Sequence, residues 1–174
     1  MRAQSPHWLD QPLQNWNRAG AALPGGGADA AVITQARARC QLPAPATPGE
    51  RALTTAGWLA LAHLDRQLAQ GEIEILAGTT LLDSACTPNE FNLFVFVAGR
   101  FAGTLSPIAM SPRADGYAGP VRFVGDAISA EFARYKAGDA SCCPSARMTV
   151  RYQINSTSGT PAVVPIDVRT TRSY

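Results

Sequence analysis

Four cysteines carry the most reactive side chains of this 174-residue sequence. They are Cys40, Cys86, Cys142 and Cys143, and no two of them have the C-x-x-C spacing of a zinc ribbon or a thioredoxin-like site. Because their number is even and they are not spaced as metal ligands, we predict two disulfides, which persist in exported proteins. A zinc site completed by one of the histidines, or a redox pair at Cys142 and Cys143, is the alternative.

The pairing of these cysteines decides what the disulfides would do. If Cys40 bonded Cys86, Cys142 would have to bond its direct neighbour Cys143 in a small strained ring, and we expect this pairing to be disfavoured. In the other two pairings the adjacent cysteines point to opposite sides of an extended segment and join two distant parts of the chain. Each bridge would then close a loop of about 50 to 100 residues and stabilise the fold by roughly 4 kcal/mol.

His63 and Asp65 are the candidates for acid–base catalysis. Two residues apart, they would share one face of a strand, and a histidine with a carboxylate partner can act as a general base. No nucleophile motif such as G-x-S-x-G accompanies them in the sequence. We therefore interpret His63 as a partly buried surface histidine, and we predict no catalytic residue, no cofactor and no metal ligand.

The candidates for binding are Arg100, Arg113, Asp115, Trp8 and Trp16. The loops that hold Arg100, Arg113 and Asp115 could converge at one end of a sheet. Asp115 is followed by a glycine, however, and this pair is also typical of a simple turn that the aspartate side chain caps. Trp8 and Trp16 are isolated in a segment rich in Pro, Gly and Asn, where they could dock on the chain's own surface or reach a partner.

The elements that must position these residues begin with a central hairpin. Residues 93–97 are dense in aromatic and β-branched side chains, which is typical of a strand buried on both faces. Gly99 can adopt the positive φ of a tight turn, residues 101–105 form the returning strand, and Pro107 ends it. We expect this hairpin at the centre of the sheet.

One helix and several strands are predicted around the hairpin. Thr47, Pro48 and Glu50 have the pattern of a capping box, so a helix should run from there to about Gly57. Strands are predicted over residues 71–76, 148–154 and 162–168, and residues 121–135 should form another hairpin, with a short helix over 129–135 as the alternative. The succession of hairpins favours an antiparallel sheet.

The expected fold class is therefore α+β. We predict a single domain with a mainly antiparallel sheet of about six or seven short strands and one early helix. The sheet should either curve around that helix or form a small, partly barrel-like structure. Residues 1–30 should be an extended arm rich in Pro and Gly, and residues 31–174 should form the domain.

Composition narrows the class of protein. Charged residues make up 16% of the chain and hydrophobic residues 46%, which is typical of a globular protein. No apolar run approaches the roughly 20 residues that a transmembrane helix needs. The basic residues are scattered along the sequence and do not predict nucleic-acid binding. The first residues lack the apolar core of a signal peptide, so, with disulfides predicted, we expect an exported protein whose signal segment has been removed.

Four segments resemble those of a known family. They are residues 94–107, which end in Phe-Ala-Gly-Thr-Leu-Ser-Pro, residues 110–116, residues 130–135, and residues 139–145, which end in Cys-Cys-Pro-Ser. Together they resemble the LppP/LprE family of bacterial cell-envelope lipoproteins and their exported relatives, from about Trp16 to the C-terminus. The resemblance implies export, but no established activity and no catalytic or ligand residue. Cys40 lies too far into the chain to be the lipid-modified cysteine of a mature N-terminus.

These features favour an exported protein, in the periplasm, in the cell envelope or secreted, that acts as a non-enzymatic binding or structural module. Its partner would be an envelope protein or a small ligand; we expect neither nucleic-acid binding nor a transmembrane segment. The alternative is a hydrolase or a thiol-redox enzyme that uses His63 with Asp65, or Cys142 with Cys143. No residue pattern indicates an oligomeric state.

Overall fold

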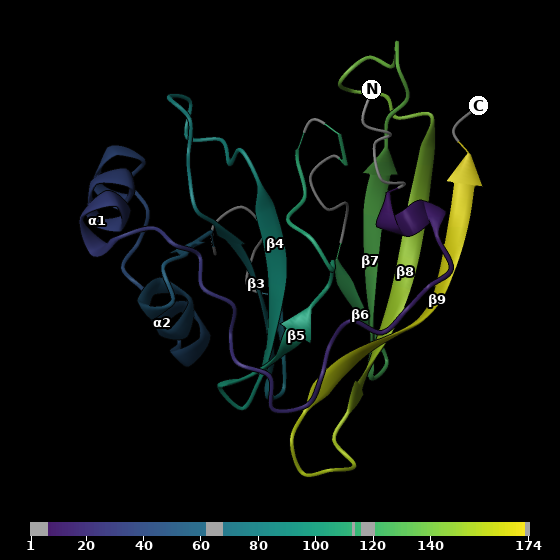
Figure 1. Cartoon of the computed structure of the whole chain (residues 1–174), viewed down its shortest axis with the longest axis horizontal. Helices are drawn as coiled ribbons and strands as arrows, with labels where there is room; N and C mark the ends of the chain where they lie inside the picture. Colours follow the sequence, from purple (N-terminus) through teal and green to yellow (C-terminus); the bar gives the residue numbers. More distant parts are fainter. Residues whose placement is uncertain (1–6, 62–67, 113, 116–120, 173–174) are drawn as a thin grey trace.

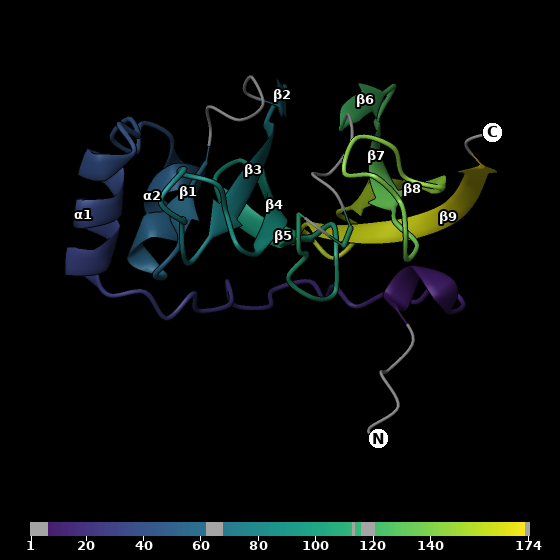
Figure 2. The same ribbon diagram turned by 90° about the horizontal axis from the view of Figure 1, so that it is seen from above.

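The computed structural model describes residues 7–61, 68–112, 114–115 and 121–172. Within them the chain forms three layers: two α-helices, a five-stranded sheet and a four-stranded sheet (Figure 1). Seen from above, the helices cover one side of the first sheet, and the second sheet lies beyond its other side (Figure 2). The largest cluster of buried side chains draws on both sheets, so the sheets share a core.

All strand pairs are antiparallel. The first sheet contains β1 (Leu59–Ala60), β2 (Leu68–Gln70), β3 (Ile73–Thr79), β4 (Phe91–Val97) and β5 (Arg100–Thr104), in the order β1-β3-β4-β5 with β2 also paired to β3. The second contains β6 (Arg122–Val124), β7 (Ala127–Arg134), β8 (Ala146–Asn155) and β9 (Ala162–Arg172), in chain order. The expectation of one curved or barrel-like sheet is therefore wrong. The long connection after β5 starts a second sheet instead of returning along the first.

The central hairpin is confirmed as β4 and β5. Phe94 and Phe96 on one face of β4 are fully buried and pack with Leu53 of a helix. Leu93 and Val95 on the other face belong to the core shared with the second sheet. Successive side chains of a strand point to opposite faces, and each face of β4 has its own covering layer. Residues 93–97 are therefore apolar without interruption.

The hairpin turn requires left-handed backbone at both central residues. Ala98 has φ 48° and Gly99 has φ 75°, the pattern of a type I′ turn, which matches the twist of the flanking strands. Gly99 was expected to take this conformation. Ala98 takes it at a steric disadvantage, and its backbone N–H donates to the carbonyl of Glu72, which holds the turn against β3.

The predicted helix is α2 (Pro48–Thr55). The Thr47 side chain accepts a hydrogen bond from the backbone N–H of Glu50 at 3.1 Å, and the Glu50 carboxylate accepts one from the N–H of Thr47 at 3.0 Å. This is the reciprocal capping box that the sequence pattern predicts, and it satisfies donors that the helix itself leaves free.

A second helix, α1 (Ala30–Arg39), was not predicted, so the expectation of a single early helix is wrong. Asp29 caps it by accepting a hydrogen bond from the N–H of Val32 at 2.9 Å. Only Ile33 and Ala36 of this helix are buried, and they pack under Leu59. Because α1 buries so few large side chains, its sequence has little of the periodicity by which an amphipathic helix is recognised.

The second sheet confirms the later strand predictions, and its last two strands are longer than expected. Residues 127–134 are a strand and not a helix, with Ile128, Ala130 and Phe132 fully buried on one face. β9 continues to Arg172, beyond the expected end at residue 168, because β8 extends to pair with it. The short strands β1 and β2 lie in residues 59–70, where the apolar side chains follow neither the period of a helix nor that of a strand.

Tyr152 of β8 joins the two sheets and offers a test of their packing. Its side chain is fully buried, and its hydroxyl donates a hydrogen bond to the carbonyl oxygen of Leu105. Tyr152→Phe should lower the free energy of unfolding by about 1–3 kcal/mol at pH 7, because the carbonyl of Leu105 stays buried without a donor. Urea unfolding of both proteins measures this, and equal stability would contradict the assignment.

The same residue predicts a pH dependence. Burial raises the pKa of Tyr152 well above its ordinary value of 10.0. The unfolded chain therefore loses this proton at lower pH than the folded chain, so the stabilisation is complete below about pH 10 and declines as the pH rises above it. The stability advantage of the unsubstituted protein over Tyr152→Phe should shrink with rising pH in that range. A constant difference from pH 8 to 11 would be inconsistent with the burial of an un-ionised phenol.

The segment before α1 runs along both sheets, from the short 3-10 helix η1 (Trp8–Asp10) beside the second sheet to α1 beside the first (Figure 2). Trp8 packs edge-on against Phe132 and Trp16 against Tyr152, with ring centroids 5.4 and 6.3 Å apart. The two tryptophans thus contact the chain's own core.

The same segment covers the edge of β5. The side-chain amide of Asn17 accepts a hydrogen bond from the backbone N–H of Thr104 and donates one to its carbonyl, each at 2.9 Å. The indole N–H of Trp16 donates to that carbonyl at 3.0 Å. Asn17 therefore takes the place of a peptide group of a neighbouring strand. An edge protected in this way is less open to pairing with another chain.

Candidate functional site

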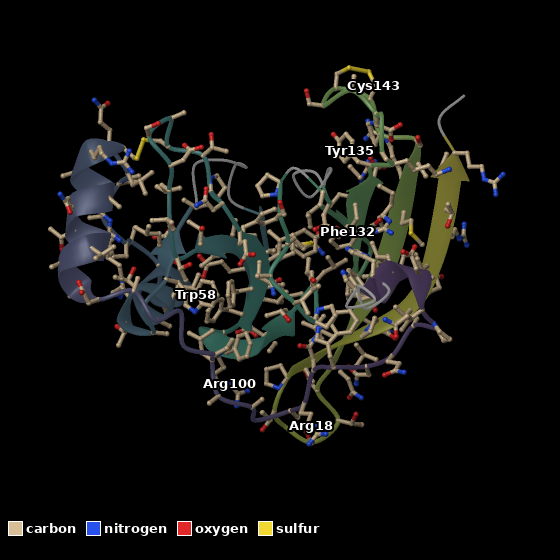
Figure 3. All side chains as sticks on the ribbon, turned by 45° about the horizontal axis from the view of Figure 1, so that its top comes forward. Arg18, Trp58, Arg100, Phe132, Tyr135 and Cys143 are labelled. Carbon is tan, nitrogen blue, oxygen red and sulfur yellow. A yellow bond between two sulfur atoms is a disulfide. The ribbon has the colours of Figure 1, made fainter. Side chains whose placement is uncertain are left out.

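The two disulfides join Cys40 to Cys86 and Cys142 to Cys143. This is the pairing that we expected to be disfavoured, and the expectation is wrong for two reasons. Cys40 ends α1 on one side of the molecule and lies 5.7 Å from Cys86 between Cα atoms, whereas Cys143 lies beyond the far end of the second sheet (Figure 3). The adjacent cysteines also lie in a turn, closed by the N–H of Cys143 on the carbonyl of Ala140, and not in an extended segment.

Asp139 organises the loop that presents the adjacent cysteines. Its carboxylate accepts hydrogen bonds from the backbone N–H groups of Lys136 and Ser145, each at 2.8 Å, and from the Ser145 hydroxyl at 2.6 Å. These hydrogen bonds lower the pKa of Asp139 below its ordinary value. The bond from the Lys136 N–H has the largest effect, and the bonds from Ser145 add to it. The loop is therefore tied together at its base by a carboxylate that stays ionised at neutral pH.

Other contacts hold the same loop to the end of β7. The hydroxyl of Tyr135 donates to the carbonyl of Ser141 at 2.8 Å, and Pro144 is buried. Cys142 and Cys143 themselves are both exposed. The arrangement displays a disulfide to solvent on a loop whose backbone is fixed by other groups.

Asp115 belongs to a charged cluster that contacts the N-terminal segment at His7 and Asp10. One of its carboxylate oxygens lies 2.5 Å from Nε2 of His7 and 3.9 Å from the guanidinium of Arg134, which also contacts Asp10 at 2.6 Å. The other accepts a hydrogen bond from the N–H of Ser111 at 3.1 Å, which closes a turn over residues 111–115. The turn expected at Asp115 and the glycine after it extends beyond the described residues. Nδ1 of His7 accepts from the N–H of Leu9. The hydrogen bond at Nδ1 and the close contact of Nε2 with Asp115 fasten the N-terminal segment to the body.

The remaining candidates lie apart from this cluster. Arg100 stands at the β4–β5 turn and donates to the carbonyl of Gly159 at 3.2 Å, in the region opposite the cysteine loop (Figure 3). Arg100 and Asp115 have different partners, Gly159 for Arg100 and His7 with Arg134 for Asp115, so the contacts do not show the convergence that the sequence left open. Arg113, His63 and Asp65 lie outside the described residues.

The outer face of the second sheet gathers arginines that are scattered in the sequence. Arg169 on β9 is paired across the strands with Thr149 on β8, and Arg147 and Arg151 lie one position along that face on either side of Thr149. Glu131 contacts Arg147 at 2.5 Å, and Asp167 contacts Arg151 at 3.2 Å. The face therefore mixes charges of both signs. Sequence reasoning missed this group because only the strand register brings its members together.

A groove of about 370 Å³ lies between the start of α2 and the turns at the ends of β3 and β4. Its lining includes Pro48, Glu72, Glu74 and Gly99. In the part of the chain that the structure describes, no group of three or more His, Cys, Asp or Glu side chains is arranged to hold a metal ion. No described helix is long and apolar enough to cross a membrane.

Comparison with known proteins supports the resemblance read from the motifs. The family model described as LppP/LprE lipoprotein matches residues 72–157. These residues, just under half of the chain, are similar to the LppP/LprE lipoprotein family. No curated protein and no solved structure matches significantly.

The LppP/LprE match covers β3 to β8 and is narrower than the expected stretch from Trp16 to the C-terminus. It contains the central hairpin, Asp115 and both adjacent cysteines. It also contains Cys86 but not Cys40, so the first disulfide ties the matched segment to a helix that lies before it.

Proposed function

We propose that this protein is an exported, disulfide-bonded cell-envelope module without enzymatic activity, which binds a partner protein or a small ligand. The observation that carries the proposal is the Cys40–Cys86 bond, which joins residues 46 positions apart and fixes α1 to the loop before β4. Disulfides of this kind form and persist in oxidising compartments. The LppP/LprE match suggests the same location.

The contacts of the polar clusters support a non-enzymatic role. His7 and Asp115 are engaged with each other and with backbone N–H groups, and Asp139 is engaged with its own loop. A general base or nucleophile needs a free atom within hydrogen-bond reach of a substrate. In these clusters the groups bind parts of the chain itself.

Two surfaces suit the proposed binding role. The groove beside Pro48 has a volume within the usual range for small-molecule sites, and Glu72 and Glu74 would favour a ligand with positive charge. The outer face around Thr149 carries charges of both signs, which suits a protein partner. Of the other expected binding residues, Arg100 adjoins the groove through Gly99, whereas Trp8 and Trp16 serve the core.

A thiol count in the protein made in an oxidising compartment tests the proposal. We expect no free thiols in denatured, unreduced protein, and a mass gain of about 4 Da on reduction, two hydrogens for each disulfide. Fractionation of the cells that naturally make the protein should place it outside the cytoplasm. Free thiols at Cys40 and Cys86 in the native material, or a cytoplasmic location, would overturn the proposal.

A further inference from the structure

The Cys142–Cys143 disulfide does not staple the fold. It joins residues one position apart, whereas Cys40–Cys86 joins residues 46 apart. A disulfide stabilises mainly by closing a loop of the unfolded chain, and the effect grows with the length of that loop. A bond between neighbours closes almost no chain. Its presence or absence should therefore matter little to global stability.

The bond is also placed where a reductant can reach it. Both cysteines are exposed, and the contacts that hold the loop involve Asp139, Tyr135 and Pro144, and not the sulfur atoms. The Cα atoms are 3.8 Å apart, closer than the usual range of about 4.4–6.8 Å for a disulfide, and bonds held outside that range are more easily reduced. The first disulfide, at 5.7 Å, lies within it.

We propose that Cys142 and Cys143 form a thiol–disulfide exchange site, which a dithiol reductant of the thioredoxin-like class opens while Cys40–Cys86 stays oxidised. This goes beyond a binding role, and it gives the module two chemically distinct states with the same fold. The two disulfides then have separate roles: one holds α1 to the sheet, and the other responds to the thiols around the protein.

The exchange balances in two steps. A thiolate of the reductant attacks one sulfur of the pair and forms a mixed disulfide, and the other cysteine leaves as a thiolate and takes up a proton. The second thiol of the reductant loses its proton and attacks the reductant's first sulfur in the mixed disulfide. The reductant leaves as a disulfide, and the second cysteine is released and protonated. Two electrons and two protons have passed to the Cys142–Cys143 pair.

The experiment uses the folded full chain with both disulfides intact. The protein is treated with limiting dithiothreitol without denaturant, quenched with acid at intervals, alkylated with N-ethylmaleimide and mapped by peptide mass. We expect the peptide that contains Cys142 and Cys143 to gain its two labels at least about tenfold faster than Cys40 and Cys86, since strained and exposed disulfides are the labile ones. Glutathione disulfide, added in excess before alkylation, should re-form the Cys142–Cys143 bond and so prevent the labelling.

A trapping experiment adds a second readout. A thioredoxin whose resolving cysteine is replaced by serine should form a mixed disulfide with Cys142 or Cys143, and the Cys142→Ala, Cys143→Ala variant should not form it. Labelling of all four cysteines at one rate, or of Cys142 and Cys143 only in denaturant, would overturn the proposal. These readouts concern the adjacent pair alone, so the exchange site can fail while the thiol count still supports an exported, disulfide-bonded module.

Discussion

Replacing Cys40 and Cys86 together by serine should lower the free energy of unfolding by about 4 kcal/mol, the chain-entropy value for a bridge of this span. The physical reason is the weak attachment of α1. Only Ile33 and Ala36 of this helix are buried, and their cluster holds few other side chains. Without the disulfide, α1 should separate from the first sheet before the core unfolds. Urea unfolding, followed by tryptophan fluorescence and by circular dichroism, measures both events.

The matched control is the Cys142→Ser, Cys143→Ser variant. It removes the same number of sulfur atoms but opens no long loop, so its unfolding midpoint should stay close to that of the unsubstituted protein. Equal losses in the two double variants would show that both bonds act as staples. No loss in either would mean that the Cys40–Cys86 bond does not constrain the unfolded chain.

Gly103→Ala should be the most damaging change to the first sheet, with a loss of about 4 kcal/mol from backbone strain and overpacking together. Gly103 has φ 140°, a conformation that side chains rarely permit. A Cβ atom there would lie 2.4 Å from Cγ of Asn17, whose amide covers the edge of β5. The substitution should therefore loosen the N-terminal segment from the sheet. Unfolding in urea gives the stability, and protection of the Thr104 amide from hydrogen exchange reports the lost contact.

Gly125→Ala is the control that measures the cost of backbone strain without a steric clash. Gly125 has φ 65°, but no atom lies within 4 Å of the Cβ that would be added, so only about 1–2 kcal/mol should be lost.

A double-mutant cycle isolates the steric clash between the added Cβ at Gly103 and the side chain of Asn17. Asn17→Ala removes the amide that Gly103→Ala would strike, so the two changes together should cost less than the sum of their separate losses. Strict additivity would contradict the contact between them.

The predictions that succeeded depend on neighbouring residues. The capping box at Thr47 and Glu50 uses groups three positions apart, and the apolar run of β4 needs only its own side chains to be recognised. Such patterns are visible in the sequence because they are set by local geometry. The same holds for the hairpin of β6 and β7, which the pattern of residues 121–135 predicts.

The features that could not be predicted depend on distant residues. Asn17 and Thr104 are 87 positions apart, and nothing at either position marks an amide as the substitute for a strand. The division into two sheets is likewise a matter of long-range pairing. The contacts of Asp115 with His7 and Arg134 also required the fold to bring three separate segments together.

The prediction of the cysteine pairing was wrong for a different reason. The prediction assumed an extended backbone at Cys142 and Cys143, which would point their side chains apart. The turn over residues 140–143 removes that assumption, and the distance between α1 and the loop after β7 excludes the long bridges (Figure 3). Neither the turn nor the distance has a clear signal in the sequence.

A disulfide map of the unreduced protein tests the central claim most directly. The protein is denatured with free thiols blocked, digested without reductant so that cleavage separates the cysteine-containing segments, and analysed by mass. The structure predicts one pair of peptides linked through Cys40 and Cys86, and a single peptide in which Cys142 and Cys143 lack two hydrogens. A peptide that links Cys40 or Cys86 to the adjacent pair would contradict both the fold of the helical side and the separate roles of the two disulfides.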